Sequence, residues 1–350
     1  MNNHPLLVQA EQAFKAGQLQ AAETAVRKLL AEQPDHLPAL RLLASILHQQ
    51  RRLPEAADTL QRYLKIAPDD SPIVNSLGVF LAEEGKTAAA LAEFERAAQM
   101  NPALAEAHNN QGIALERLGR LDDSAAAFTK AVAIRPAYAE AQANLGRVLR
   151  HQNKQEQAIR ELQQAIDLDA RHAPAYHTLA GTLEDLGRPE AGYIWRRRLV
   201  EMLPGDPVLH SDLLWSTLCV PDVPPEQRLA EHLEWGRRHA EPLARNVRPH
   251  ANDRTPDRRL RVGYVSPNFG AQAIGWFMAP LLAAHERQQV EVYCYSDIAY
   301  PDWMTKKIHG LADQWRETTR LSHHDLAELV RRDKIDLLID VRGHMAGHRL

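Results

Sequence analysis

Residue types suited to acid–base or ligand chemistry gather near the C-terminal end of the 350-residue sequence. Asp340 lies in the apolar run 334–344, where its carboxylate could act on a substrate or simply cap a turn, and both interpretations stay open. His344 and His348 are four residues apart in a glycine-flanked loop. A zinc-like site needs at least three ligands and no third is at hand, so we expect no metal. Cys294 lies in another apolar run and is expected to be a buried strand residue.

Two glycines and an amide follow the apolar run 259–266. Gly270 and Gly275 have neither the Gly-Lys-Ser/Thr of a phosphate-binding loop nor the spacing of a dinucleotide fingerprint. Gln272 lies between them. Its amide can hydrogen-bond a sugar or a phosphate, but it has no group that titrates near neutral pH and cannot be a general base.

Four asparagines form a second set of candidate binding residues, far from the first. Each side-chain amide offers a donor and an acceptor, so a row of them can hold the backbone of an extended peptide without reading its side chains. They could equally be solvated residues of an exposed face, and the sequence does not decide between the two. The set is Asn75, Asn109, Asn110 and Asn144.

The composition excludes several classes of protein. With 42 Lys and Arg against 45 Asp and Glu, the net charge of −3 gives no broad basic field for nucleic acid. No run approaches the ~20 apolar residues of a membrane span, and the N-terminus lacks a secretory pattern. Two cysteines cannot form a disulfide framework. We therefore expect a cytoplasmic protein without nucleic-acid or membrane partners.

The asparagines are positioned by a repeat of 34 residues. Prolines recur at this interval from Pro34 to Pro204, with one step replaced by Ala170, and they delimit six units over 3–206. The eighth and twentieth positions of every unit are small, and the fifteenth is often glycine, where a helix must stop and reverse. Each unit is therefore predicted to be two antiparallel helices, which stack on their neighbours into a superhelix with a groove.

This pattern resembles the tetratricopeptide repeat at nearly every consensus position, over about 204 residues (six units of 34). In that class the fifth and sixth positions of the first helix point into the groove, and the four asparagines occupy these positions. The resemblance implies that the groove holds an acceptor protein or another partner protein.

After the repeats, residues 207–258 are expected to form a helical bridge and a linker rich in proline and arginine. Strands are then predicted at 260–266, 290–296 and 334–344, the last continuously apolar and of the buried kind. Helical patterns separate them. This order predicts parallel βαβ units, so residues 259–350 are expected to be a partial Rossmann-like α/β region.

Ligands of such sheets bind at the carboxyl ends of the strands. Two loops qualify, 267–275 and 342–347. We expect Gly270, Gly343 and His344, which lie in these loops, to contribute to substrate binding.

The order of repeats, bridge and the strings RVGYVSPNFG, GWFMAPLL, VEVYCYSD and IDLLIDVRGHMAG resembles the protein O-linked N-acetylglucosamine transferase family, which includes bacterial members and is related to plant SPINDLY-type fucosyltransferases. The resemblance implies a two-lobed GT-B catalytic domain that transfers a sugar from a nucleotide-sugar to protein Ser or Thr with inversion. UDP-N-acetylglucosamine is the expected donor. No metal or other cofactor is implied, because helix dipoles and side chains stabilise the leaving diphosphate.

Two departures from the family pattern affect the expected site. Family members commonly carry a His at the position of Gln272. The sequence also ends at Leu350, whereas in the family a second lobe follows and supplies most of the nucleotide-sugar site. We therefore expect a truncated chain or a fragment, with no sugar transfer by these 350 residues alone. Gln272 and Asp340 are the candidate catalytic-site residues.

Three functions remain open from the sequence. The first is a protein glycosyltransferase whose repeats present acceptor proteins. The second is a non-enzymatic scaffold that binds a partner through its repeats. The third is another sugar-nucleotide enzyme of the same fold, with a different donor or an N-linkage.

Overall fold

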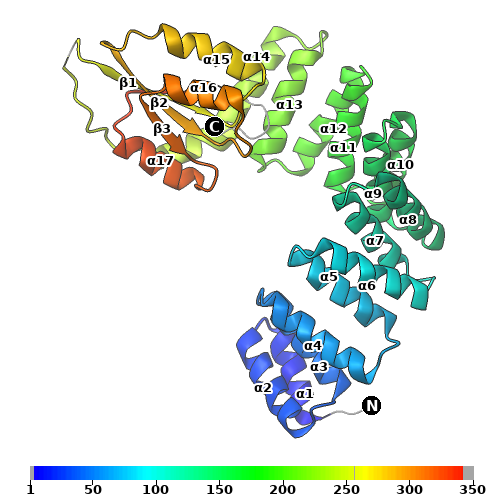
Figure 1. Cartoon of the computed structure of the whole chain (residues 1–350). Helices are drawn as coiled ribbons and strands as arrows, with labels where there is room; N and C mark the ends of the chain where they lie inside the picture. The colour runs from blue at the N-terminus through cyan, green and yellow to red at the C-terminus, as the bar shows by residue number, and fades with distance from the viewer. Residues whose placement is uncertain (1–3, 256, 342–350) are drawn as a thin grey trace. The chain divides into compact units, whose positions relative to one another are not determined.

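The computed structural model describes residues 4–255 and 257–341. The chain forms two compact units, Met1–Trp195 and Arg196–Leu350. The first is helical throughout its described part, and the second combines helices with a parallel sheet (Figure 1). This confirms the predicted solenoid followed by an α/β region. None of the described helices is both long and apolar enough to cross a membrane.

Helices alternate along the repeats in the predicted 34-residue steps (Figure 1). The first and second helices of each unit pack together in units one to five, and successive units also touch. The helices are α1 (Pro5–Lys15), α2 (Leu19–Glu32), α3 (Leu37–Gln49), α4 (Leu53–Ile66), α5 (Ser71–Glu83), α6 (Thr87–Met100), α7 (Ala105–Arg117), α8 (Leu121–Ile134), α9 (Ala139–His151), α10 (Gln155–Leu168), α11 (Ala173–Asp185) and α12 (Pro189–Met202).

Small residues at the eighth position let the two helices of a unit approach closely. A methyl group on Gly112 of α7 would lie 2.7 Å from Cε1 of Phe128 on α8, which is too close for carbon atoms. Gly78 faces Phe94 in the same way. The buried Ser124, at the small twentieth position, donates to the Gly112 carbonyl at 2.8 Å and so leaves no unpaired hydroxyl in this contact.

The turn within each unit requires a left-handed residue at the fifteenth position. Glycine fills it in four units, with φ between 71° and 81°. Arg51 and Asn153 adopt the same conformation in units two and five, with φ of 61° and 58°. The turn geometry is thus kept where glycine is absent.

The bridge contains α13 (Pro207–Cys219) and α14 (Pro225–Trp235), followed by a π-helical turn (Gly236–Ala240) and a 3-10 turn (Glu241–Asn246). The linker behind them is attached to the sheet region by side chains. Arg258 donates to both carboxylate oxygens of Asp336 at 2.7 and 2.5 Å, and Asn252 Nδ2 donates to the same carboxylate at 2.7 Å.

The sheet has four parallel strands in the order β3-β2-β1-β4. They are β1 (Leu260–Ser266), β2 (Val290–Ser296), β3 (Gln314–Glu317) and β4 (Leu337–Asp340). The described helices of this part are α15 (Ala273–Ala284), α16 (Trp303–Leu311) and α17 (His323–Arg332). One cluster packs α15 and α16 against one face of the sheet, and a second packs α17 against the other face.

Two strand predictions need correction. The expected buried strand at 334–344 is β4, an edge strand in the described part of the chain, with Leu337 53% and Leu338 52% exposed. Leu337 and Leu338 point to opposite faces of the sheet, so both faces of this edge strand are open in the described part of the chain. The other edge strand, β3, was not predicted, because its four residues Gln-Trp-Arg-Glu show no apolar pattern.

Candidate functional site

The order of the strands places one candidate site at the carboxyl ends of β1 and β4. From β1 the chain moves outward to β2 and β3, then returns to pair β4 on the other side of β1. Ligands of open α/β sheets bind at such a reversal. Val265 of β1 is in register with Asp340 of β4, so the loop after β1 and the end of β4 lie at the same edge.

The loop after β1 is held in shape by backbone contacts that only glycine permits. A methyl group on Gly275 would lie 1.9 Å from the Gly270 carbonyl oxygen, an impossible distance. The Gln272 N–H donates to the same carbonyl at 2.7 Å. Ser266 Oγ accepts from the Asn268 N–H at 3.0 Å. Gln272 is consequently fixed at the N-cap position, immediately before α15.

Gln272 is exposed, and its side-chain oxygen accepts a hydrogen bond from the Asn268 amide. The N–H groups of the first turn of α15 lie next to it, and such groups carry the positive end of the helix dipole. Asp340 is half-buried at the neighbouring strand end. The edge therefore combines a carboxylate, an amide and a helix start, which suits it to orient a hydroxyl near an anionic group.

Asp302 secures this loop, and the sequence analysis did not single it out. Its Oδ2 accepts from the Ala271 N–H at 2.7 Å, while Oδ1 accepts from the Thr305 N–H at 2.9 Å. Gly270 leaves the space, since a methyl group there would lie 3.0 Å from Oδ2. The bond from Ala271, together with those from Thr305, lowers the pKa of Asp302. The Asp-x-x-Thr capping box was visible in the sequence, but the bond to Ala271 was not.

Of the other predicted residues in this region, Gly270 is buried within the loop, and Gly343 and His344 lie outside the described residues. Cys294 is fully buried in β2, as expected. Burial raises the pKa of its thiol to about 12, so it is protonated and unreactive at neutral pH.

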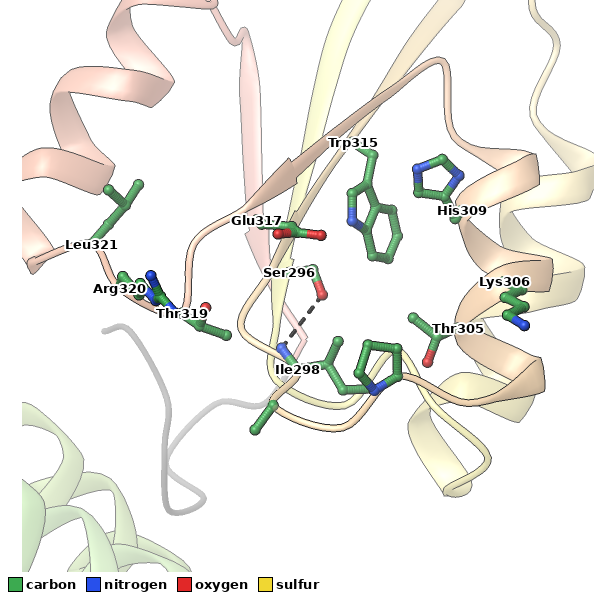
Figure 2. A pocket seen from close by; sticks show the side chains of 12 residues that line it. Ser296, Ile298, Thr305, Lys306, His309, Trp315, Glu317, Thr319, Arg320 and Leu321 are labelled. Atoms are coloured by element: carbon green, nitrogen blue, oxygen red, sulfur yellow. Dashed lines mark hydrogen bonds between the residues drawn. The ribbon is translucent and has the colours of Figure 1, made fainter. Parts of the chain in front are cut away.

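A cleft of about 930 Å³ opens at the carboxyl ends of β2 and β3, on the other side of β1 from Asp340. Figure 2 shows Trp315 and Glu317 on one side, Ile298 on the opposite side, and Arg320 on a loop facing α16. The cleft could not be located from the sequence, because the four residues of β3 are too few to show a strand pattern.

The predicted asparagine row pairs with itself between the first helices of neighbouring units. Asn110 Nδ2 donates to Asn75 Oδ1 at 3.0 Å, and Asn144 Nδ2 donates to Asn109 Oδ1 at 3.1 Å. Asn109 is only 1% exposed, so its side chain lies within this pairing, and its contact with a peptide stays a prediction. Asn75, Asn110 and Asn144 are half-buried.

Comparison with known proteins agrees with both parts of this architecture. Residues 7–71, 81–139 and 115–183 match tetratricopeptide-repeat models, and residues 239–350 match the model of glycosyl transferase family 41. A rice protein named "Probable UDP-N-acetylglucosamine--peptide N-acetylglucosaminyltransferase SPINDLY" is 32% identical over 123 residues, 34% of this chain. A Caenorhabditis elegans UDP-N-acetylglucosamine--peptide N-acetylglucosaminyltransferase is 30% identical over 94 residues, 26% of this chain. The matches cover 13% and 8% of those relatives' lengths.

Solved structures show the same likeness. A mutant O-GlcNAc transferase of Thermobaculum terrenum aligns with a TM-score of 0.55 and 32% identity, over 70% of this chain and 47% of that one. The pilus biogenesis factor PilW aligns with a TM-score of 0.54 at 20% identity, over 59% of this chain and 96% of that one, and shows a shared fold alone. The chain therefore joins tetratricopeptide repeats to a region that matches the glycosyl transferase family 41 model, as its resemblance to the protein O-linked N-acetylglucosamine transferase family predicted.

Proposed function

We propose that the protein containing this chain transfers N-acetylglucosamine from UDP-N-acetylglucosamine to Ser or Thr of acceptor proteins, without a metal ion. The observation that carries this is the family 41 match over 239–350, which includes the whole described sheet and its strand-end loops. The relatives and the solved transferase named above support the same reaction. The proposal places the protein in the cytoplasm, in keeping with two free cysteines.

In this proposal the strand ends of the sheet serve the acceptor side. Asp340 accepts a hydrogen bond from the acceptor hydroxyl, and Gln272, which cannot take up a proton, orients the sugar or a phosphate oxygen. The repeats bind the acceptor protein, with Asn75, Asn110 and Asn144 contacting its backbone. Asn75 and Asn110 each use one amide atom in their mutual bond, so in the described part of the chain Asn75 Nδ2 and Asn110 Oδ1 are available. Asn144 already donates to Asn109 and accepts from Arg147, so a peptide would share or displace these bonds.

The test is transfer from a radiolabelled nucleotide-sugar. The purified protein that contains this chain is incubated with labelled UDP-N-acetylglucosamine and a cell lysate, with and without EDTA. We expect time-dependent label on Ser or Thr of lysate proteins that EDTA does not abolish. Absence of protein labelling, or label only from another nucleotide-sugar, would overturn the proposal, the latter in favour of a different donor.

A further inference from the structure

The cleft at the ends of β2 and β3 is lined by ionisable side chains, of which His309 also packs its ring against Trp315, with ring centroids 4.9 Å apart. Lys306, His309, Arg320 and Glu317 all line it. Within the described part of the chain none of these four side chains forms an ion pair or a hydrogen bond. By contrast, Arg316 on the same strand as Glu317 is held by Asp333 at 3.1 Å.

The charges in the cleft favour an anion. Lys306 and Arg320 bring two permanent positive charges against the one carboxylate of Glu317, and His309 adds a third basic group. Figure 2 shows Arg320 on the loop after β3 and His309 and Lys306 on α16, so the basic groups come from both sides of the cleft. The planar guanidinium of an arginine binds phosphate and carboxylate groups with two parallel hydrogen bonds.

The remaining walls suit a ring that carries hydroxyl groups. The half-buried Trp315 presents an indole to the cleft and is supported from behind by Phe269, with ring centroids 5.6 Å apart. Ile298 faces it from the opposite side (Figure 2). Glu317, in register with Ser296 across β2 and β3, adds a carboxylate that can accept hydrogen bonds from sugar hydroxyls.

We propose that this cleft binds an anionic sugar, with its phosphate or carboxylate against Arg320 and Lys306 and its ring against Trp315. Its volume lies within the roughly 300–1,000 Å³ of small-molecule sites. The site is separate from the β1–β4 edge and does not depend on the proposed transfer reaction. It would stand even if the protein were not a transferase.

Binding is measured by titration calorimetry of the chain with glucose 1-phosphate, glucuronate, glucose and inorganic phosphate. We expect one of the two charged sugars to bind, and which one does identifies the anionic group. Glucose and inorganic phosphate alone should bind at least about tenfold more weakly, because each lacks half of the recognised chemistry.

Matched variants locate the site. Arg320→Ala and Lys306→Ala should each weaken binding of the charged sugar, by about tenfold for Arg320→Ala. The controls Arg332→Ala and Lys307→Ala change exposed residues of the same types that do not line the cleft, and should leave affinity unchanged. Equal losses in controls and cleft variants, equal binding of glucose or of inorganic phosphate, or no binding by either charged sugar would each overturn the proposal.

Discussion

Asp302 at the start of α16 accepts a hydrogen bond from the Ala271 N–H at 2.7 Å and so joins that helix to the loop after β1. The residues are 31 positions apart, and the contact holds the loop that carries Gln272. The same carboxylate also caps α16 through Thr305. One side chain therefore attaches the start of α16 to the loop after β1.

The first prediction tests the contact between Asp302 and the loop after β1. Asp302→Ala should speed hydrogen exchange at the Ala271 amide, because the acceptor of that N–H is lost, and Asp302→Asn should restore part of the protection. Ser322→Ala is the matched control, since Ser322 caps α17 and does not touch the loop. Exchange is read by mass spectrometry of the 267–275 segment. Equal protection in Asp302→Ala and the original chain would contradict the proposed anchoring.

The second prediction concerns the close approach at Gly275. Gly275→Ala should destabilise the α/β unit by several kcal/mol, because its methyl group would meet the rigid Gly270 carbonyl at 1.9 Å. Gly310→Ala, in the open part of α16, should instead stabilise by about 0.5–1 kcal/mol through helix propensity. Urea unfolding of both variants measures this. A Gly275→Ala protein of unchanged stability would show that the loop can relax.

The third prediction follows from the Asp336 anchor. Hydrogen bonds from Arg258, the Arg261 N–H and Asn252 hold the pKa of Asp336 far below its usual range. A carboxylate whose pKa is lower in the folded state stabilises the fold at pH values above its unfolded-state pKa of about 4. This stabilisation disappears as the pH falls from there toward the folded-state pKa. Asp336→Asn should therefore lower the melting temperature by a few degrees at pH 7. Between pH 5 and pH 2 the melting temperature of this variant should fall less than that of the original chain.

The comparison of melting temperature against pH checks this directly. Asp222→Asn is the control, because Asp222 is exposed and has no partner in the described part of the chain. If the Asp336→Asn and original curves stayed parallel down to pH 2, the anchor would not contribute to acid sensitivity.

The fourth prediction concerns the two thiols. Cys219 is exposed, while Cys294 is fully buried with a pKa raised to about 12 by burial. A thiol reagent at pH 8 should label Cys219 quickly and Cys294 only when the chain unfolds. Mass spectrometry of the labelled peptides identifies the site. Rapid labelling of Cys294 in the folded chain would mean that the sheet opens readily.

The fifth prediction distinguishes the roles of two neighbouring asparagines. Asn109→Ala should cost about 1 kcal/mol of stability, because it leaves the half-buried Asn144 amide without its acceptor. Asn110→Ala should cost less stability and weaken capture of acceptor proteins instead. Thermal unfolding and pull-down of the two variants give the comparison. The reverse assignment of the two effects would contradict the observed pairing.

The repeats were predictable because one pattern recurs in six units, so the period is supported by many independent positions. Gly112 is an example of a contact that such a pattern does encode. Its small size was correctly interpreted as close helix packing, and Phe128 indeed contacts it. The pairing of Asn109 with Asn144, by contrast, depends on how far each helix rotates in its stack, which no single unit determines.

The candidate site was predictable only in part. The positions of Gln272 and Asp340 at one edge follow from strand order, and local patterning identified β1, β2 and β4. The bond from Ala271 to Asp302 and the cleft beside β3 join residues far apart in sequence. The four residues of β3 are too few to show a strand pattern, so the sequence could not predict the cleft, and nothing in the local pattern indicates the Ala271–Asp302 hydrogen bond.

The most direct test of the proposed function compares initial rates of sugar transfer by variants of the protein that contains this chain. Asp340→Ala should lower the rate about a hundredfold, because the carboxylate that accepts the acceptor hydroxyl is removed. Asp222→Ala and Cys294→Ala should stay near the original rate, and Gln272→His should keep activity. Equal rates for Asp340→Ala and Asp222→Ala would contradict the placement of the acceptor site at the β1–β4 edge.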